Sequence, residues 1–134
     1  MKLVVDTNVL FSYFWKNSIT QKLLISSNFE LISPSKALEE IKKYSKEIIT
    51  KTGLSKSKFS SELRNLKQIV KFIEKKDYSK SLKEAEDISP DKGDIDFFAL
   101  CMKEGCFLWS NDSKLKNQEK IKVITTEELI EILF

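Results

Sequence analysis

The sequence predicts an α/β fold in which helices surround a central parallel sheet. Two unbroken apolar runs, Leu3–Val5 and Cys106–Trp109, have the length and composition of strands that are buried on both faces. Amphipathic helical patterns separate the predicted strands. Only three Gly and two Pro in 134 residues argue against an all-β protein built from many turns. This order fits a single parallel α/β domain spanning residues 1–134.

The predicted elements follow one another with short connections. The first strand runs into Asp6, and Thr7 or Asn8 can cap a helix predicted over 8–16. A second helix is expected over 19–27, a second strand over 29–32, and a third helix from 35 to the Thr52-Gly53 stop. A lysine-rich helix is predicted over 55–76, because apolar residues keep helical spacing as far as residue 73. A short helix within 75–86, a loop over 88–93, a helix from 94, a strand over 106–109 and a final strand and helix from 122 complete the chain.

The composition excludes several classes of protein. Hydrophobic residues at 41% and charged residues at 32% are typical of a soluble globular protein. No apolar run approaches the roughly 18 residues of a membrane span, and the start lacks the pattern of a signal peptide, so a cytoplasmic location is expected. The sequence has no His, which excludes Ser-His-Asp triads, Cys-His pairs and His-ligated zinc. Its two cysteines cannot form a structural zinc site, and Cys101 is interpreted as a core residue.

Acidic residues follow both predicted central strands. Asp6 ends the first, and Ser110-Asn111-Asp112 ends the second. Parallel strands bring their carboxyl ends to one edge of the sheet, where open α/β folds place their chemistry. Asp94 begins a helix, and Glu40 lies in an early turn of the helix after Pro34. Helix capping is the alternative interpretation of each Asp, but two strands that deliver acids to the same edge are hard to explain by capping alone.

Clustered carboxylates require a counter-charge. Carboxylates within a few ångströms of one another cannot all stay ionised unless their pKa values rise or cations bind. No Arg lies in these motifs, and the nearest Lys residues are expected in flanking loops. Oxygen ligands of this kind suit Mg²⁺ or Mn²⁺. The net charge of +3 becomes +8 for the rest of the surface if five acids gather in one pocket, a distribution that favours a polyanionic substrate. Ordinary solvated lysines are the alternative interpretation.

The sequence resembles the PIN domain family, and within it the VapC-like toxin ribonucleases and related prokaryotic PIN proteins. The resemblance spans essentially the whole chain. It rests on motifs that are, in chain order, Val4–Asn8, Ser33-Pro34, Leu38–Ile41, Asp94 with Ala99-Leu100, Gly105, Leu108–Asp112 and the ending Lys122–Leu129. It implies a three-layer α/β/α sandwich with a central parallel sheet, and a Mg²⁺- or Mn²⁺-dependent ribonuclease.

The resemblance also implies roles for particular residues. The acids that match the family's metal-binding quartet are Asp6, Glu40, Asp94 and Asp112. Glu39 is the less favoured alternative to Glu40, and Asp96 is an extra acid that could reach the metal. Asn8 and Ser110 resemble polar residues that orient the acids by hydrogen bonding.

Other kinds of protein compete with this interpretation. A phosphoaspartate enzyme would carry a second acid at position 8, where this chain has Asn, and no glycine-rich phosphate loop is present. A catalytically silent PIN-fold protein that binds RNA or acts as a scaffold is the main competitor. RNA is the expected substrate, and the lysine-rich helix is one candidate surface for it. The resemblance further implies an antitoxin partner and a homodimer, for which Phe11, Phe14 and Trp15 could offer an apolar surface.

Overall fold

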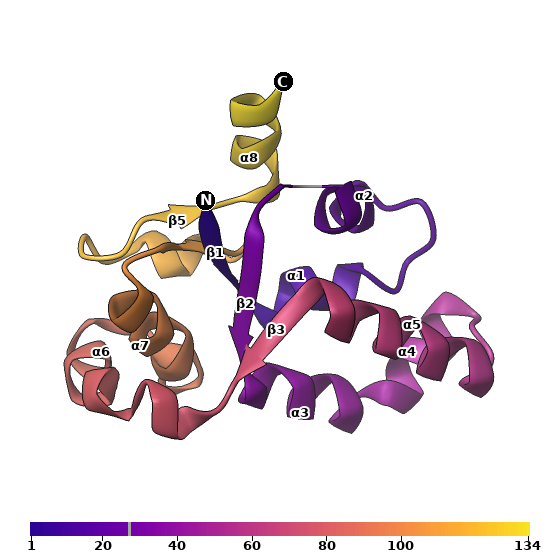
Figure 1. Cartoon of the computed structure of the whole chain (residues 1–134), viewed down its shortest axis with the longest axis horizontal. Helices are drawn as coiled ribbons and strands as arrows, with labels where there is room; N and C mark the ends of the chain where they lie inside the picture. Colours follow the sequence, from indigo (N-terminus) through magenta and orange to yellow (C-terminus); the bar gives the residue numbers. More distant parts are fainter. Residues whose placement is uncertain (27) are drawn as a thin grey trace.

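The computed structural model describes residues 1–26 and 28–134, and it contains a five-stranded parallel sheet flanked by helices (Figure 1). The strand order across the sheet is β3-β2-β1-β4-β5. The strands are β1 (Lys2–Val5), β2 (Glu30–Pro34), β3 (Val70–Ile73), β4 (Phe107–Trp109) and β5 (Val123–Ile124). The predicted α/β fold with a central parallel sheet is therefore confirmed.

The first strand lies at the centre of the sheet. It pairs with β2 and with β4, and Val4 is level with Ile32 on one side and Leu108 on the other. Leu3, Val4 and Val5 are all fully buried, which explains why the strand is apolar at every position rather than alternating. The backbone N–H of Asp6 donates to the carbonyl of Trp109, so β1 and β4 end side by side.

Eight α-helices connect and flank these strands in the part of the chain that the structure describes. They are α1 (Thr7–Ser12), α2 (Ile19–Ser26), α3 (Ser35–Lys43), α4 (Ser45–Thr52), α5 (Lys56–Ile69), α6 (Leu82–Ile88), α7 (Ile95–Glu104) and α8 (Thr126–Leu133). Of these, α7 packs directly against β1, β2 and β4. No helix in the described ranges has the length and hydropathy to cross a lipid bilayer.

The structure corrects the predicted helix over 55–76. Helix α5 ends at Ile69, and Val70–Ile73 forms an edge strand that pairs with β2. Its sequence, Val-Lys-Phe-Ile, is rich in strand-forming residues, but its apolar positions also continue the helical spacing of α5. Pairing with β2 decides between two local patterns that the sequence leaves equivalent. The polar stretch that follows holds two single-turn helices, η1 (Lys75–Asp77) and η2 (Ser79–Ser81), before α6.

Other boundaries also differ from the prediction. The helix after Pro34 is interrupted at Tyr44, whose φ of −98° and ψ of 16° separate α3 from α4. The helix predicted over 8–16 ends at Ser12, and its cap is Asp6 rather than Thr7 or Asn8. Residue 27, the predicted end of the second helix, lies outside the described residues.

Candidate active site

Asp6 lies at the carboxyl end of the central strand and is held by three hydrogen bonds. Its Oδ1 accepts from the Thr7 backbone N–H at 2.8 Å, while its Oδ2 accepts from the Ser110 hydroxyl at 2.6 Å and the Asn8 amide at 3.0 Å. The side chain is only 8% exposed. Burial raises the pKa of Asp6 above its ordinary value, and the three hydrogen bonds act in the opposite direction. Asp6 is thus both a helix cap and a buried, oriented carboxylate.

The Ser110 hydroxyl joins the ends of β1 and β4. It is fully buried, and besides donating to Asp6 it accepts from the Asn8 amide at 3.2 Å and the Asp112 backbone N–H at 3.1 Å. The Asn111 backbone N–H donates to Asn8 Oδ1 at 3.3 Å across the same gap. Asn8 and Ser110 therefore make the kind of contacts with Asp6 that the sequence predicted. Their part in any reaction stays a prediction.

Asp94 and Asp112 approach Asp6 from two other segments. Asp94 ends the single-turn helix η3 (Lys92–Asp94) and stands at the start of α7, but its side chain makes no capping hydrogen bond there. The pKa of Asp94 is raised to about 6. Burial is the largest cause, followed by the negative charges of Asp6, Asp91 and Asp112. Asp112 likewise raises the pKa of Asp6, and it also caps the single-turn helix η4 (Ser113–Lys116). The capping alternative is therefore right for Asp6 and Asp112 and wrong for Asp94.

Glu40, on α3, joins these acids from a fourth segment. Burial and the charge of Asp6 raise its pKa, while the Thr7 hydroxyl and nearby lysines lower it. The Thr7 oxygen is buried and has no partner at normal hydrogen-bond geometry within residues 1–26 and 28–134. Glu39 is exposed, and its charge helps to raise the pKa of Tyr78 rather than that of another acid of this group. Glu40, and not Glu39, therefore lies among the other acids, and its role as a metal ligand stays a prediction.

Lys36 is a residue of this region that the sequence interpretation missed. Its ammonium group donates to the Gly93 carbonyl at 3.2 Å, which ties α3 to the turn that carries Asp94. It lowers the pKa of both Glu40 and Asp94. We expected lysines only in flanking loops. The available signal was the spacing of four residues between Lys36 and Glu40, which places both on one face of a helix.

Asp96 is not brought into this group. Its Oδ2 accepts from the Tyr78 hydroxyl at 2.6 Å, and its side chain is 8% exposed. The pKa of Tyr78 is raised by its own burial and by this carboxylate. Asp96 is thus paired with a tyrosine of the segment between β3 and α6.

The four acids are the type of ligand that a divalent cation prefers, but their side chains are not already arranged around a metal position. Within the described ranges, no three His, Cys, Asp or Glu side chains lie close enough to hold a metal ion as they stand. Two observations nevertheless agree with a cation at this edge. Carboxylates from separate segments raise each other's pKa, and the buried Thr7 hydroxyl makes no hydrogen bond of normal geometry among the described residues, although it is near enough to Glu40 to lower the pKa of that acid. Asp6, Glu40, Asp94 and Asp112 are the groups that would hold it.

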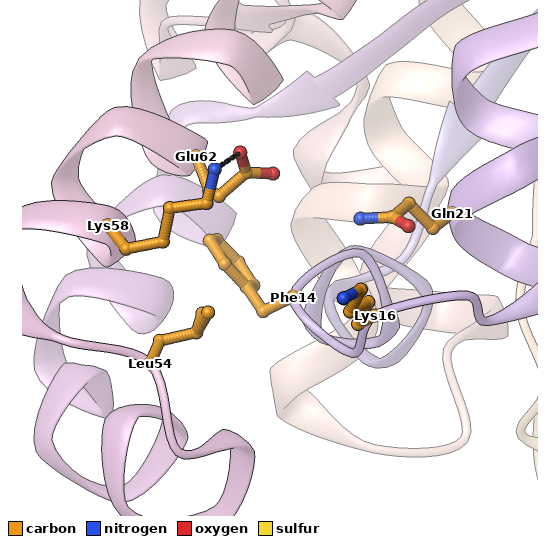
Figure 2. Close-up of a pocket in the computed structure, with 6 residues that line it drawn as sticks. All are labelled: Phe14, Lys16, Gln21, Leu54, Lys58 and Glu62. Carbon is orange, nitrogen blue, oxygen red and sulfur yellow. Dashed lines mark ion pairs between the residues drawn. The ribbon is translucent and has the colours of Figure 1, made fainter.

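A separate cavity lies away from the acids. It has a volume of about 410 Å³ and is lined by Phe14, Lys16, Gln21, Leu54, Lys58 and Glu62 (Figure 2). Lys58 and Glu62 form an ion pair at 3.5 Å, and Phe14 is buried and stacked on Phe59. None of the predicted site residues lines this cavity, so it offers no support for the predicted chemistry. Phe14 is a core residue and not part of an apolar surface.

Comparison with known proteins identifies the family. The PIN domain family matches residues 4–132 of the chain. Its members are typically metal-dependent nucleases. No curated protein matches the sequence.

Among solved structures, a chain in the crystal structure of VapBC2 from Rickettsia felis bound to a DNA fragment from their promoter has the same fold. The TM-score is 0.65 at 18% identity, and the match covers 93% of this chain and 98% of that one. The match to residues 4–132 spans almost the whole sequence and agrees with the shared architecture. The chain belongs to the PIN domain family.

Proposed function

We propose that this protein is a metal-dependent endoribonuclease that hydrolyses RNA phosphodiester bonds with Mg²⁺ or Mn²⁺. The observation that carries the proposal is the convergence of four acids from separate segments on one edge of the sheet, namely Asp6, Glu40, Asp94 and Asp112. The charge of Asp6 raises the pKa of Glu40 and of Asp94. The charge of Asp112 raises the pKa of Asp6 and of Asp94. Capping explains only part of this arrangement, because the Asp94 side chain makes no capping hydrogen bond at the start of α7.

The acids differ in how firmly the fold holds them before a ligand arrives. Asp6 is the fixed member, because three hydrogen bonds orient it before any ligand arrives. Asp94 and Glu40 are only partly buried, so they can adjust toward a ligand. These carboxylates would hold divalent cations, which would supply Lewis acidity toward a water and the phosphate. Lys36 holds the turn that carries Asp94 against α3 and offers a positive charge to an incoming phosphate.

Cleavage of structured RNA tests the proposal. The wild-type protein is incubated with RNA in Mg²⁺, in Mn²⁺ and in EDTA, alongside Asp6→Asn and Asp94→Asn. We expect cleavage with a divalent ion, none in EDTA, and a loss of at least 100-fold in both variants. Asp87→Asn, an exposed acid on α6, is the matched control and should cleave as wild type. Equal cleavage by all variants would place the activity elsewhere or in a contaminant.

A catalytically silent RNA-binding protein is the second candidate. The observation in its favour is that no three of the described acids are already arranged as metal ligands. It predicts RNA retention that weakens with salt and no cleavage with any divalent ion. Calorimetric titration with Mn²⁺ separates the two candidates before any RNA is added, because only the nuclease requires the four acids to bind the metal.

The proposal extends to protein partners. A small antitoxin that covers the acidic edge is proposed because the structurally similar chain belongs to VapBC2, and a homodimer is proposed alongside it. Exposed apolar side chains that could serve such contacts include Trp15 at 37%, Ile132 at 64% and Phe134 at 92% exposure. A monomeric mass by light scattering at micromolar concentration would contradict the homodimer. Failure of the protein encoded by a neighbouring short gene to bind this one would contradict the antitoxin.

A further inference from the structure

A second cavity opens beside the acidic edge, and lysines from three segments converge on it. Its volume is about 640 Å³, and it lies between η1, α6 and the start of α7. Lys75 comes from η1, Lys83 from α6 and Lys92 from η3. The rest of the lining consists of Ser79, Leu82, Glu86, Ile95 and Asp96. We call this feature the lysine pocket.

The positive charges of the lysine pocket are not neutralised by neighbouring carboxylates. In the portion of the chain that the structure describes, none of Lys75, Lys83 and Lys92 lies within 4 Å of a carboxylate oxygen. Of the two acids in the lining, Asp96 is buried, and its Oδ2 accepts the Tyr78 hydroxyl hydrogen bond at 2.6 Å. Glu86 is exposed. The lining therefore contains three exposed lysines against one exposed glutamate.

The lysine pocket and the four acids share one edge of the sheet. Asp6, Glu40 and Asp112 follow the carboxyl ends of β1, β2 and β4, and η1 follows the carboxyl end of β3. A single turn of chain links the two sites, because Lys92 and Asp94 are the two ends of η3. Figure 1 shows α3, where Glu40 lies, and the α6–α7 pair on the same lower side of the sheet. A polymer bound at the acids can thus reach the lysine pocket without crossing the molecule.

We propose that the lysine pocket binds a backbone phosphate of single-stranded RNA, a few nucleotides from the bond that lies at the acids. This inference rests on the proposed function. A phosphate is favoured over a base because the pocket has no aromatic lining, and the nearby Tyr78 is buried with its hydroxyl paired to Asp96. Lysines contact phosphates as point charges and carry no sequence information, so the pocket contributes affinity and register. The lysine-rich helix α5 is a weaker candidate, since its Lys58 is already paired with Glu62.

Binding in the absence of divalent ions tests the lysine pocket separately from catalysis. A fluorescently labelled single-stranded RNA of about 20 nucleotides is titrated with full-length protein in EDTA, between about 50 and 200 mM salt. The pocket variant carries Lys83→Gln with Lys92→Gln. The control carries Lys22→Gln with Lys46→Gln, two exposed lysines on α2 and α4 with the same change in net charge. Thermal unfolding of both variants checks that the fold is unchanged.

We expect the pocket variant to bind at least tenfold more weakly at low salt and the control to change less than twofold. The slope of log K against log salt should fall by about 0.7 in the pocket variant, the value for one lost phosphate contact with a single strand. Replacing the same two lysines by Arg should restore most of the affinity, because the charge returns. With Mn²⁺ present, the pocket variant should show a raised KM and a kcat within about twofold of wild type.

Several results would overturn the inference. If RNA affinity falls equally in the pocket and control variants, the loss is a general effect of charge. If the pocket variant keeps wild-type affinity, the pocket does not bind RNA. A wild-type protein that binds no RNA in EDTA would exclude the lysine pocket. The proposed function fails in a different way. If the wild-type protein cleaves no RNA with any divalent ion while the pocket variant still loses RNA affinity, the nuclease is excluded and the lysine pocket is supported.

Discussion

Replacing Asp94 by Asn should stabilise the metal-free protein at neutral pH, although it should abolish the proposed activity. Asp94 makes no capping hydrogen bond, and its neighbours Asp6, Asp91 and Asp112 are acids. Burial and these charges raise its pKa from 3.8 to about 6. Each pKa unit corresponds to ~1.4 kcal/mol of preference for the neutral form, so the ionised carboxylate costs the fold at most ~3 kcal/mol. Partial exposure reduces this cost to about 1–2 kcal/mol.

The sign of the pH dependence follows from the direction of this pKa change. Below pH 3.8 Asp94 is protonated in both the folded and the unfolded protein, and it contributes no penalty. As the pH rises toward 6, the unfolded chain loses the proton first, so the wild-type protein loses stability over this window. Above about pH 6 the penalty is complete. The Asp94→Asn variant has no such penalty, because an amide does not ionise, and the difference between variant and wild type should grow over the same window.

Thermal unfolding followed by circular dichroism measures the effect. In EDTA at pH 7.5 the Asp94→Asn protein should melt about 3–8 °C above wild type, and at pH 3.5 the two should coincide. Millimolar Mn²⁺ should raise the melting temperature of wild type and leave that of the variant nearly unchanged. If the variant is instead less stable by the same amount at every pH, Asp94 is a structural residue, and charge crowding does not govern this position.

Three further predictions concern contacts around the site. Ser110→Ala should lower the free energy of unfolding by about 2–3 kcal/mol in urea, because the buried Asp6 carboxylate loses its shortest hydrogen bond, and should weaken Mn²⁺ binding about 10–100-fold by calorimetry. Trp109→Phe should cost about 1–3 kcal/mol in the same urea assay, since the indole N–H donates to the Thr126 hydroxyl at 3.0 Å inside the core. Glu128, whose pKa is lowered to about 2 by a lysine of η4 and the capping box of α8, stabilises the fold above pH 4.5 and progressively less as the pH falls toward 2. In the Glu128→Gln variant the melting temperature should depend less on pH between 4.5 and 2 than it does in the wild type.

The sequence was sufficient for the sheet centre and for the edge where the acids gather. Continuous apolar runs predict strands buried on both faces, which holds for all of 3–5 and for Leu108 and Trp109, although Phe107 is exposed, and parallel strands leave one edge for whatever follows them. That logic placed Asp6 and Asp112 beside each other without coordinates. The hydrogen bonds that Asn8 and Ser110 make with Asp6 were expected from the resemblance to PIN domains and not from the strand pattern.

Long-range pairing and side-chain direction could not be predicted in the same way. The residues Val70–Ile73 fit the end of a helix as well as a strand, and only the presence of β2 beside them decides. Asp94 and Asp96 lie two residues apart, yet one faces Asp6 and the other pairs with Tyr78. A helix turns about 100° per residue, so two neighbouring acids at its start point to different surroundings. The helical pattern names both acids without choosing between them, and it was the resemblance to PIN domains that assigned Asp94 to the quartet and left Asp96 as an extra acid.

The energetic cost of the acids bears on the choice between a nuclease and a silent PIN protein. Burial and mutual repulsion raise the pKa of Asp6, Glu40 and Asp94 together, so each carboxylate weakens the metal-free fold at neutral pH. Lys36 offsets only part of this for Glu40 and Asp94. A protein that needed only the PIN architecture would be more stable with amides at these positions, and substitutions that raise stability are easily reached. Acids that weaken the fold are best explained by a ligand that needs them, and a divalent cation is the ligand that matches their charge.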